Sequence, residues 1–213
     1  MQNVLLSWIR VDLILETISG VIALMVSHYA NKAFRLTGQK RLSDLSTGFL
    51  VLSAGMFGRV LGTLYFFVLA AQGGPSSPSA QTLMGVVIVA YGVMRVMAYL
   101  VFAVATRHSR KEDVPEQAPL ALALAIPILV SPTLEMLAII VLVIIVLQNL
   151  MNYLAVKTRY ALYVLIGFVL LLVSHILGIF SLTDLRGYAL SQVAQFLGFS
   201  SFLILLRKAS GDE

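Results

Sequence analysis

The stretch PEQAPLALALAIPILVSP, residues 115–132, decides the layout of this chain. It carries prolines at positions 115, 119, 127 and 132, and it has no charged residue between Ala118 and Val130. A bilayer core of about 30 Å takes roughly 20 helical residues, so the stretch is long enough for a short crossing helix bent by its prolines. If it crosses, the chain has seven membrane helices and the segments on its two sides run parallel. If it does not, there are six, and everything after it lies on the opposite side.

The composition places the whole chain among helical membrane proteins. Of its 213 residues, 59% are hydrophobic and 12% are charged. Several apolar runs are long enough to cross a bilayer, and they must be helices because hydrocarbon offers the backbone no other hydrogen-bond partners. We therefore expect one transmembrane domain over residues 1–213, in the cell membrane and surrounded by lipid. The chain has no cysteine, which excludes disulfides and thiolate chemistry.

The apolar runs divide into two arms joined by the central stretch. Arm one covers about residues 11–107, the linking helix about 115–131 and arm two about 133–208. A basic hairpin loop is expected at residues 31–41 and an uncharged turn at residues 73–79. The expected spans besides the linking helix are about Asp12–Ala33, Asp44–Ala71, Thr82–Thr106, Leu134–Asn152, Tyr160–Phe180 and Tyr188–Leu206.

The distribution of lysine and arginine favours seven helices over six. Basic residues concentrate in cytoplasmic loops near the membrane ends of helices. With seven helices and the N-terminus outside, eleven basic residues lie inside and two, Arg10 and Arg186, lie outside; with six helices the counts are eight and five. We therefore expect a seven-helix bundle with its N-terminus outside and its C-terminus inside. The same placement accounts for the net charge of +5 without a nucleic-acid partner.

Arm two partly repeats arm one at a shift of 119 residues. Leu15-Glu16 aligns with Leu134-Glu135, and Gly48-Phe49 aligns with Gly167-Phe168. Five identities are found between residues 12–62 and 131–181, a number that two apolar segments can share by chance. A single linking helix would make the two arms parallel, giving three helices, one linking helix and three more (a 3+1+3 plan). The axis that relates the arms would then lie along the membrane normal. The sequence leaves this tandem repeat as a hypothesis.

Four ionisable residues form a predicted polar cluster near the outer boundary: Glu16, Arg59, Glu135 and His175. They come from four spans and lie at similar depth, counted at about 1.5 Å per residue. A charge within a bilayer costs roughly 3 kcal/mol or more, so each needs a partner or a function. We expect Arg59 to pair with Glu16, Glu135 or both. The cluster is either a structural ion pair or a site for a solute, a proton or a lipid headgroup.

Two further groups of residues stand out. Small residues four positions apart on the second span, Ala54, Gly58 and Gly62, would let another helix pack closely. Gln192 and Gln195 of the last span could line the interior or bond between helices. A second polar cluster is predicted nearer the inner boundary, from His28, Arg95, Gln148, Asn149 and Gln195.

No catalytic residue, cofactor or metal site is expected, and the chain is not expected to be an enzyme. A transmembrane haem or a zinc site needs paired ligands at one depth, which the three histidines do not supply. A retinal protein needs a lysine midway along the last helix, which has none before Lys208.

The expected function is that of a non-catalytic subunit that packs with other membrane proteins or with copies of itself, which the short loops favour. Two alternatives remain open. The polar clusters favour a small-solute or proton/ion transporter that uses the buried Glu, Arg and His groups. The basic inner loops would suit a seven-helix sensor that signals through a separate cytoplasmic partner.

Overall fold

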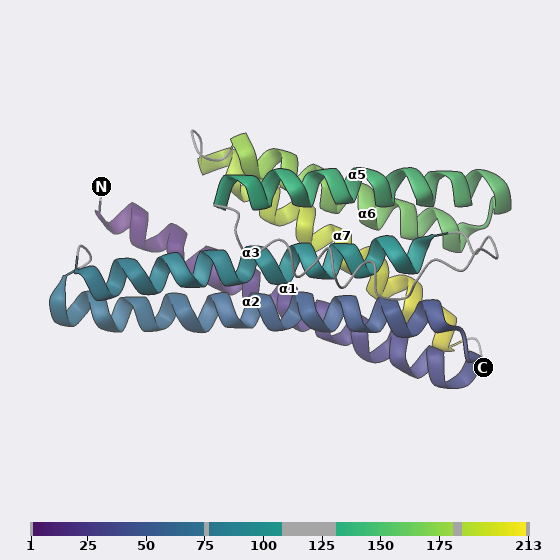
Figure 1. The fold of residues 1–213 in the computed structure, drawn as a ribbon, viewed down its shortest axis with the longest axis horizontal. Helices are drawn as coiled ribbons and strands as arrows, with labels where there is room; N and C mark the ends of the chain where they lie inside the picture. Colours follow the sequence, from purple (N-terminus) through teal and green to yellow (C-terminus); the bar gives the residue numbers. More distant parts are fainter. Residues whose placement is uncertain (1, 75–76, 108–130, 181–184, 212–213) are drawn as a thin grey trace.

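The structure is a computed structural model that describes residues 2–74, 77–107, 131–180 and 185–211. All of the described secondary structure is α-helical, in six helices that lie roughly side by side (Figure 1). The predicted linking helix, residues 115–131, falls almost entirely outside the described residues. The helices are α1 (Gln2–Thr37), α2 (Lys40–Gly73), α3 (Pro78–Thr106), α5 (Ser131–Val156), α6 (Arg159–Phe180) and α7 (Leu185–Gly211).

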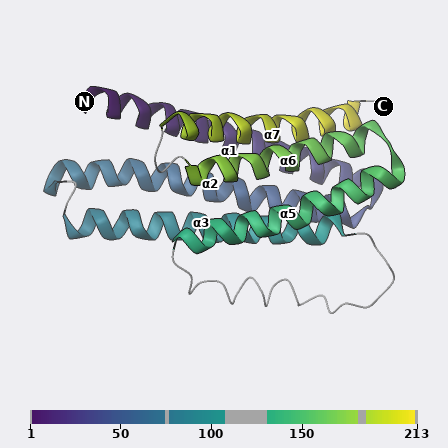
Figure 2. The same cartoon turned by 90° about the horizontal axis from the view of Figure 1, so that it is seen from above.

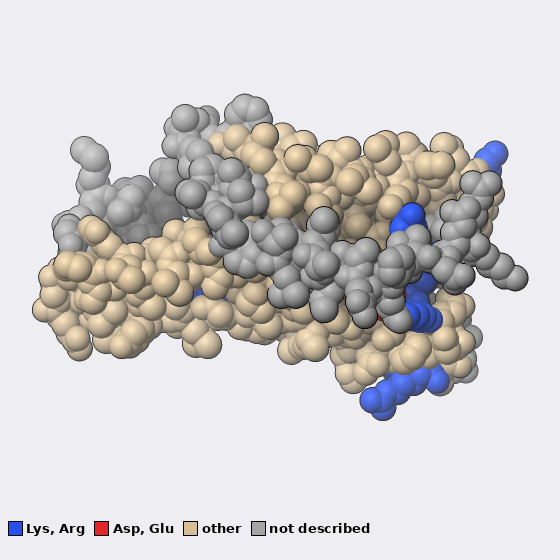
Figure 3. All heavy atoms as spheres, in the orientation of Figure 1, with Lys and Arg blue, Asp and Glu red and all other residues tan. Residues whose placement is uncertain are grey.

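Each described helix contains a segment long and apolar enough to cross a membrane, which indicates a multi-pass membrane protein. The outer surface is correspondingly apolar: Leu61 is 66% exposed and Met151 is 72% exposed. Lysine and arginine side chains gather at the end of the bundle where the C-terminus lies, as Figure 3 shows on one face. We call this the basic end, and the other the far end.

The first turn is shorter than the sequence suggested. A basic loop was expected at residues 31–41, but α1 continues to Thr37 and α2 begins at Lys40. Lysine, arginine and alanine are good helix formers, so the helices extend past the apolar core. Gly38 alone takes a left-handed conformation, with φ of 69°, and its N–H donates to the Phe34 carbonyl at 2.8 Å.

The six helices close into a ring in which each packs mainly against two neighbours. The order around the ring is α1, α2, α3, α5, α6, α7 and back to α1. Serine side chains bond α1 to α2: Ser27 Oγ donates to the Ser46 carbonyl at 2.8 Å, and Ser53 Oγ donates to the Gly20 carbonyl at 2.9 Å. Such bonds hold helices together where water is absent.

Helices α3 and α5 run in the same direction, although they follow one another in the chain. Arg95 pairs with Glu135, and ten or so residues further along both helices Thr106 Oγ1 donates to Gln148 Oε1 at 2.8 Å. Helices α1 and α7 are also parallel, and the two termini lie at opposite ends of the bundle (Figures 1 and 2). Because α5 begins beside Gly92, midway along α3, arm one extends beyond arm two at the far end.

Four of the five fully buried phenylalanines of the described chain form one group of rings in the half of the bundle nearer the basic end. They are Phe49 of α2, Phe102 of α3, Phe168 of α6 and Phe202 of α7, each 0% exposed. Ring centroids within an arm are 4.7 Å apart for Phe49 and Phe102 and 4.9 Å apart for Phe168 and Phe202. Between the arms, Phe49 lies 5.1 Å from Phe202, and Phe102 lies 5.6 Å from Phe168. We call these residues the phenylalanine quartet.

Two glycines make room for the quartet. A Cβ atom on Gly48 would lie 2.3 Å from the Phe102 ring, and one on Gly167 would lie 2.6 Å from the Phe202 ring. Real side chains do not approach so closely, so the rings occupy the space that these glycines leave. The glycine-phenylalanine pair that the sequence singles out in each arm is therefore part of the core.

Candidate functional site

Arg59 of α2 binds two carboxylates of α1, and one of these carboxylates also binds α7. Arg59 Nη1 donates to Glu16 Oε1 at 3.1 Å, and its Nη2 donates to Asp12 Oδ2 at 3.2 Å. The two acidic residues are one helical turn apart on α1 and therefore share a face. From α7, the Tyr188 hydroxyl and the Gln192 amide both donate to Asp12 Oδ1. We call these five residues the Arg59 cluster.

A second network joins α3 to α5 and α6. Arg95 pairs with one carboxylate oxygen of Glu135, and His175 Nδ1 lies 2.5 Å from the other. His175 Nε2 lies 2.6 Å from the Tyr99 hydroxyl. A neutral imidazole with its proton on Nδ1 satisfies both contacts, since it donates to Glu135 and accepts from Tyr99. We call these four residues the Arg95 cluster.

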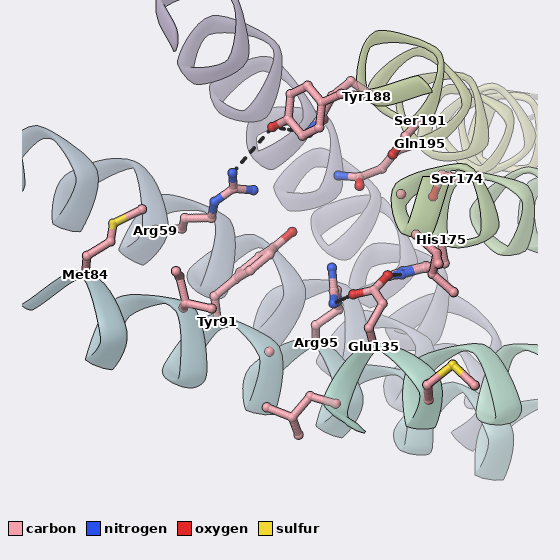
Figure 4. Close-up of a pocket in the computed structure, with 17 residues that line it drawn as sticks. Arg59, Met84, Tyr91, Arg95, Glu135, Ser174, His175, Tyr188, Ser191 and Gln195 are labelled. Atoms are coloured by element: carbon pink, nitrogen blue, oxygen red, sulfur yellow. Dashed lines mark hydrogen bonds and ion pairs between the residues drawn. The ribbon is translucent and has the colours of Figure 1, made fainter. Parts of the chain in front are cut away.

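The ring of Tyr91 separates the two arginines. The Arg59 guanidinium carbon lies 5.3 Å from the ring centroid and that of Arg95 lies 5.1 Å from it. Figure 4 shows the ring between them, with Glu135 bridging Arg95 and His175. Both distances are within the range for cation–π attraction. The two clusters therefore flank one aromatic side chain of α3.

A cavity of about 560 Å³ lies between the two arms at this level. Its lining combines polar side chains with methionine, leucine, isoleucine and glycine. We call this cavity the chamber. Its charged and polar lining residues are Arg59, Tyr91, Arg95, Glu135, Ser174, His175, Tyr188, Ser191, Gln192 and Gln195.

The phenylalanine quartet lies beyond the chamber toward the basic end. Along α3, Arg95 lines the chamber, Tyr99 lies one turn further and Phe102 follows. The centroid of the Tyr99 ring is 5.3 Å from that of His175 and 6.3 Å from that of Phe102. Phe102 is 0% exposed and Tyr99 is 2% exposed. Toward the basic end, the chamber is therefore followed by the contact between Tyr99 and His175 and then by a buried aromatic layer.

The structure distributes the predicted outer cluster over the two networks. Glu16 and Arg59 pair with each other, whereas Glu135 and His175 pair in the Arg95 cluster. The prediction was that Arg59 pairs with Glu16, Glu135 or both; the structure pairs it with Glu16 and adds Asp12, while Glu135 pairs with Arg95 instead. Both networks meet at the chamber, so the four predicted residues lie in one region of the bundle.

The predicted inner cluster is not gathered in one place. Arg95 and Gln195 line the chamber together with the outer residues. Gln148 accepts from Thr106, and Asn149 Nδ2 donates to the Ile145 carbonyl of its own helix at 2.8 Å. His28 is exposed on α1. Depth counted along each helix does not distinguish side chains that face the interior from side chains that hydrogen-bond to their own helix.

The three small residues of α2 face different surroundings. A Cβ on Gly62 would lie 2.3 Å from a methyl group of Val87 on α3, so Gly62 permits close packing of α2 against α3. Gly58 is exposed and has nothing within 4 Å of such a Cβ. Ala54 is also exposed.

In the two clusters and the ring between them, four residues were not singled out in the sequence: Asp12, Tyr91, Tyr99 and Tyr188. Each lies four residues from one that was. Asp12 precedes Glu16 by four residues, Tyr91 and Tyr99 flank Arg95 at the same spacing, and Tyr188 precedes Gln192 by four, so each group shares one helix face.

Within the described parts of the chain, no group of three or more His, Asp or Glu side chains is arranged to hold a metal ion. Comparison with protein-family models, with curated proteins and with solved structures gave no match.

Proposed function

We propose that this protein is a small-solute transporter and that the chamber is its binding site. The observation that carries the proposal is a chamber between two three-helix arms whose lining includes two arginines, a glutamate and a histidine, with a buried aromatic layer beyond it toward the basic end. Ion-binding and solute sites of transporters characteristically lie at such an interface, near the middle of the membrane. Charges buried there are costly and are typical of a transport pathway.

The contacts between the arms support this function. Arg95 of α3 pairs with Glu135 of α5, and Asp12 of α1 bonds with Tyr188 and Gln192 of α7. In contacts of this kind, a polar group of the solute can replace one of the two bonded side chains. Rocking of one arm against the other would open the quartet and close the chamber, which is alternating access around a fixed site.

A single introduced cysteine tests the transport proposal without knowledge of the solute, because the chain has no other thiol. Ser191→Cys places a thiol in the chamber. We expect charged, membrane-impermeant thiol reagents to label it from either side of the membrane, because the two arms alternate. Val193→Cys is the control: Val193 lies two residues away and is 47% exposed on the outer surface, where lipid excludes the reagent. Labelling of Ser191→Cys from one side only, in every condition, would contradict transport.

We further infer a seven-pass topology with the far end outside. A chain that leaves one helix at the basic end and enters a parallel helix at the far end has to return across the membrane between them. The parallel α3 and α5, and the termini at opposite ends of the bundle, support an odd number of crossings (Figure 2). The basic end would face the cytoplasm by the positive-inside rule.

Cysteines at Ser77 and Ser210 test this topology. Ser77 caps the start of α3 at the far end and Ser210 lies in the last turn of α7. In intact cells, an impermeant reagent is expected to label Ser77→Cys and to label Ser210→Cys only after the membrane is opened. Equal labelling of both in intact cells would restore the six-pass alternative.

A tandem repeat fits the same arrangement. Exchanging α1, α2 and α3 with α5, α6 and α7 reproduces every neighbour in the ring. The exchange also carries Phe49 to Phe168 and Phe102 to Phe202, whose within-arm distances of 4.7 and 4.9 Å are nearly equal. These correspondences support a two-fold relation between the arms, with its axis along the bundle.

A second candidate function is that of a subunit in a larger membrane assembly, formed with other membrane proteins or with copies of this chain. The exposed Ala54 and Gly58 favour it, because small residues on a lipid-facing surface let a neighbouring helix approach closely.

Two glycine substitutions separate this role from folding. Gly62→Leu is expected to destabilise the protein itself, because the new side chain collides with Val87. Gly58→Leu is expected to leave the fold intact and to weaken only association with a partner, because no described residue lies within 4 Å of a Cβ at that position. The measurements are thermal stability of the solubilised protein and its size in mild detergent. If Gly58→Leu keeps the size of the parent, that face contacts lipid alone.

A further inference from the structure

We propose that Glu16 binds a proton, and that its protonation frees Arg59 to bind the carboxylate of a small monoanionic solute in the chamber. The inference rests on the proposed transport function and specifies its solute class and its coupling ion. It follows from the hydrogen bonds of three carboxylates, the charge of the two clusters and the donors that face the chamber.

The three carboxylates of the clusters are unequally satisfied. Asp12 accepts hydrogen bonds on both oxygens, from Arg59, Tyr188 and Gln192. Glu135 also uses both oxygens, for Arg95 and His175.

Glu16 is the exception among them. It is 1% exposed, and only its Oε1 is bonded; Oε2 has no partner among the described residues. A buried carboxylate with one oxygen that accepts no hydrogen bond has lost its hydration without full compensation. It is therefore the carboxylate that gains most from taking a proton.

Two further buried polar atoms near Glu16 in the fold also have no partner among the described residues. Gln192 is 6% exposed and lines the chamber, and its unpartnered atom is the acceptor Oε1. Its amide nitrogen donates to Asp12, which lies one turn from Glu16 on α1. The other is the Ser19 hydroxyl, one turn after Glu16. A carboxyl O–H at Glu16 would add a donor to this region, where these acceptors are unused.

The charge balance points the same way. With His175 neutral, the clusters hold three carboxylates and two guanidinium groups, an excess of one negative charge among the described residues. The charged and titratable groups facing Glu16 are Asp12 on its own helix, Arg59 on α2 and Tyr188 on α7, with Tyr91 and Arg95 beyond them on α3. One proton on Glu16 makes the two clusters neutral.

Protonation of Glu16 also changes what Arg59 can bind. One proton from the outer aqueous phase adds to Glu16 Oε2, and the carboxylate becomes a neutral carboxylic acid; no other covalent bond is formed or broken. Glu16 Oε1 is then a neutral carbonyl oxygen, so its bond with Arg59 Nη1 loses its charge assistance and can be exchanged for a stronger, anionic acceptor, while Nη2 keeps Asp12. Arg59 lines the chamber, where its planar guanidinium matches a carboxylate.

A monoanion bound together with one proton restores the charge of the empty chamber. The same anion without the proton would add a second uncompensated negative charge in a low-dielectric region, which is strongly unfavourable. The apolar lining residues, among them Met84, Leu134 and Ile179, would contact a short hydrocarbon part of the solute. The arrangement thus fits electroneutral uptake of a small organic acid with a proton.

Infrared difference spectroscopy tests the proton without any transport assay. Purified protein in lipid bilayers is compared at low and high pH, and we expect the carbonyl band of one buried, protonated carboxyl group. Carbon-13 labelling of glutamate should shift the band in the parent, whereas labelling of aspartate should not. Glu16→Gln should abolish the band and Glu135→Gln should retain it. A band that survives in folded Glu16→Gln overturns the proposal, as does the absence of any band in the parent.

Binding of butyrate tests the solute class. Calorimetry in two buffers of different ionisation enthalpy should show about one proton taken up per butyrate bound, and hence about tenfold weaker apparent binding per pH unit above neutrality. Glu16→Gln, which resembles the protonated form, should bind butyrate with no proton uptake and no pH dependence. Butanol and butylammonium are the neutral and cationic controls.

Three binding results would overturn the proposal: butyrate binding without proton uptake in the parent, preferential binding of butylammonium, or no binding by any straight-chain acid from acetate to hexanoate. The infrared band and the labelling of Ser191→Cys are independent readouts. A band at Glu16 with one-sided labelling would reject transport alone. Two-sided labelling without the band would reject the proton site alone.

Discussion

Replacing Arg59 by leucine is expected to destabilise the protein by about 3 kcal/mol or more, because it leaves Glu16 and Asp12 without their common cation. The Glu16 side chain is 1% exposed and that of Arg59 is 23% exposed, so water replaces little of the lost interaction. Unfolding in mixed micelles measures the loss. Arg207→Leu is the matched control, since Arg207 is exposed on α7 and its replacement should change stability little.

The double variant Arg59→Leu with Glu16→Gln separates structure from function. Removing both charges should recover roughly half of the lost stability, because only Asp12 then remains charged and it keeps Tyr188 and Gln192. If the pair only fixes helix register, the double variant should also behave like the parent in two-sided labelling of Ser191→Cys. If the charges take part in transport, stability recovers and transport does not. A double variant no more stable than Arg59→Leu would contradict the pairing.

Adding one methyl group to either glycine that packs against the phenylalanine quartet, Gly48 or Gly167, is expected to lower the free energy of unfolding by about 2 kcal/mol, a typical value for overpacking a closed core. In Gly48→Ala the new atom would lie 2.3 Å from the Phe102 ring, and in Gly167→Ala it would lie 2.6 Å from the Phe202 ring. The rings cannot move aside freely, because each is 0% exposed and contacts two others. Similar losses at the two positions would support the two-fold relation between the arms.

Gly58→Ala is the control for the quartet, since nothing lies within 4 Å of the added atom. It should be neutral or slightly stabilising, because alanine favours the helix. Combining Gly48→Ala with Phe102→Leu should recover part of the loss, because the smaller side chain vacates the contested space. If Gly48→Ala and Gly58→Ala are equally stable, the rings do not fill the space beside Gly48.

The sequence by itself determined that this is an all-helical membrane protein, and it located the six described spans to within several residues at most ends. Long apolar runs carry that information, because the bilayer sets their length and hydrocarbon leaves the backbone no alternative to the helix. The sequence also predicted a carboxylate partner for Arg59, either Glu16 or Glu135 or both, because a charge in hydrocarbon needs an opposite charge nearby. Helix extensions such as residues 31–37 were missed, since nothing in the composition ends a helix at the membrane boundary.

Only the tertiary structure decided which polar residues meet. Arg95 was assigned to an inner group by its depth, yet it pairs with Glu135, which was assigned to the outer one. Depth along a helix is readable from sequence, whereas the direction in which a side chain points depends on which helices are neighbours in the ring. That order brings together the residues of α2, α3, α5, α6 and α7 that line the chamber, while Gly48, Gly62 and Gly167 allow close packing within each arm. Contacts between residues so far apart in the chain leave no periodic trace in the sequence.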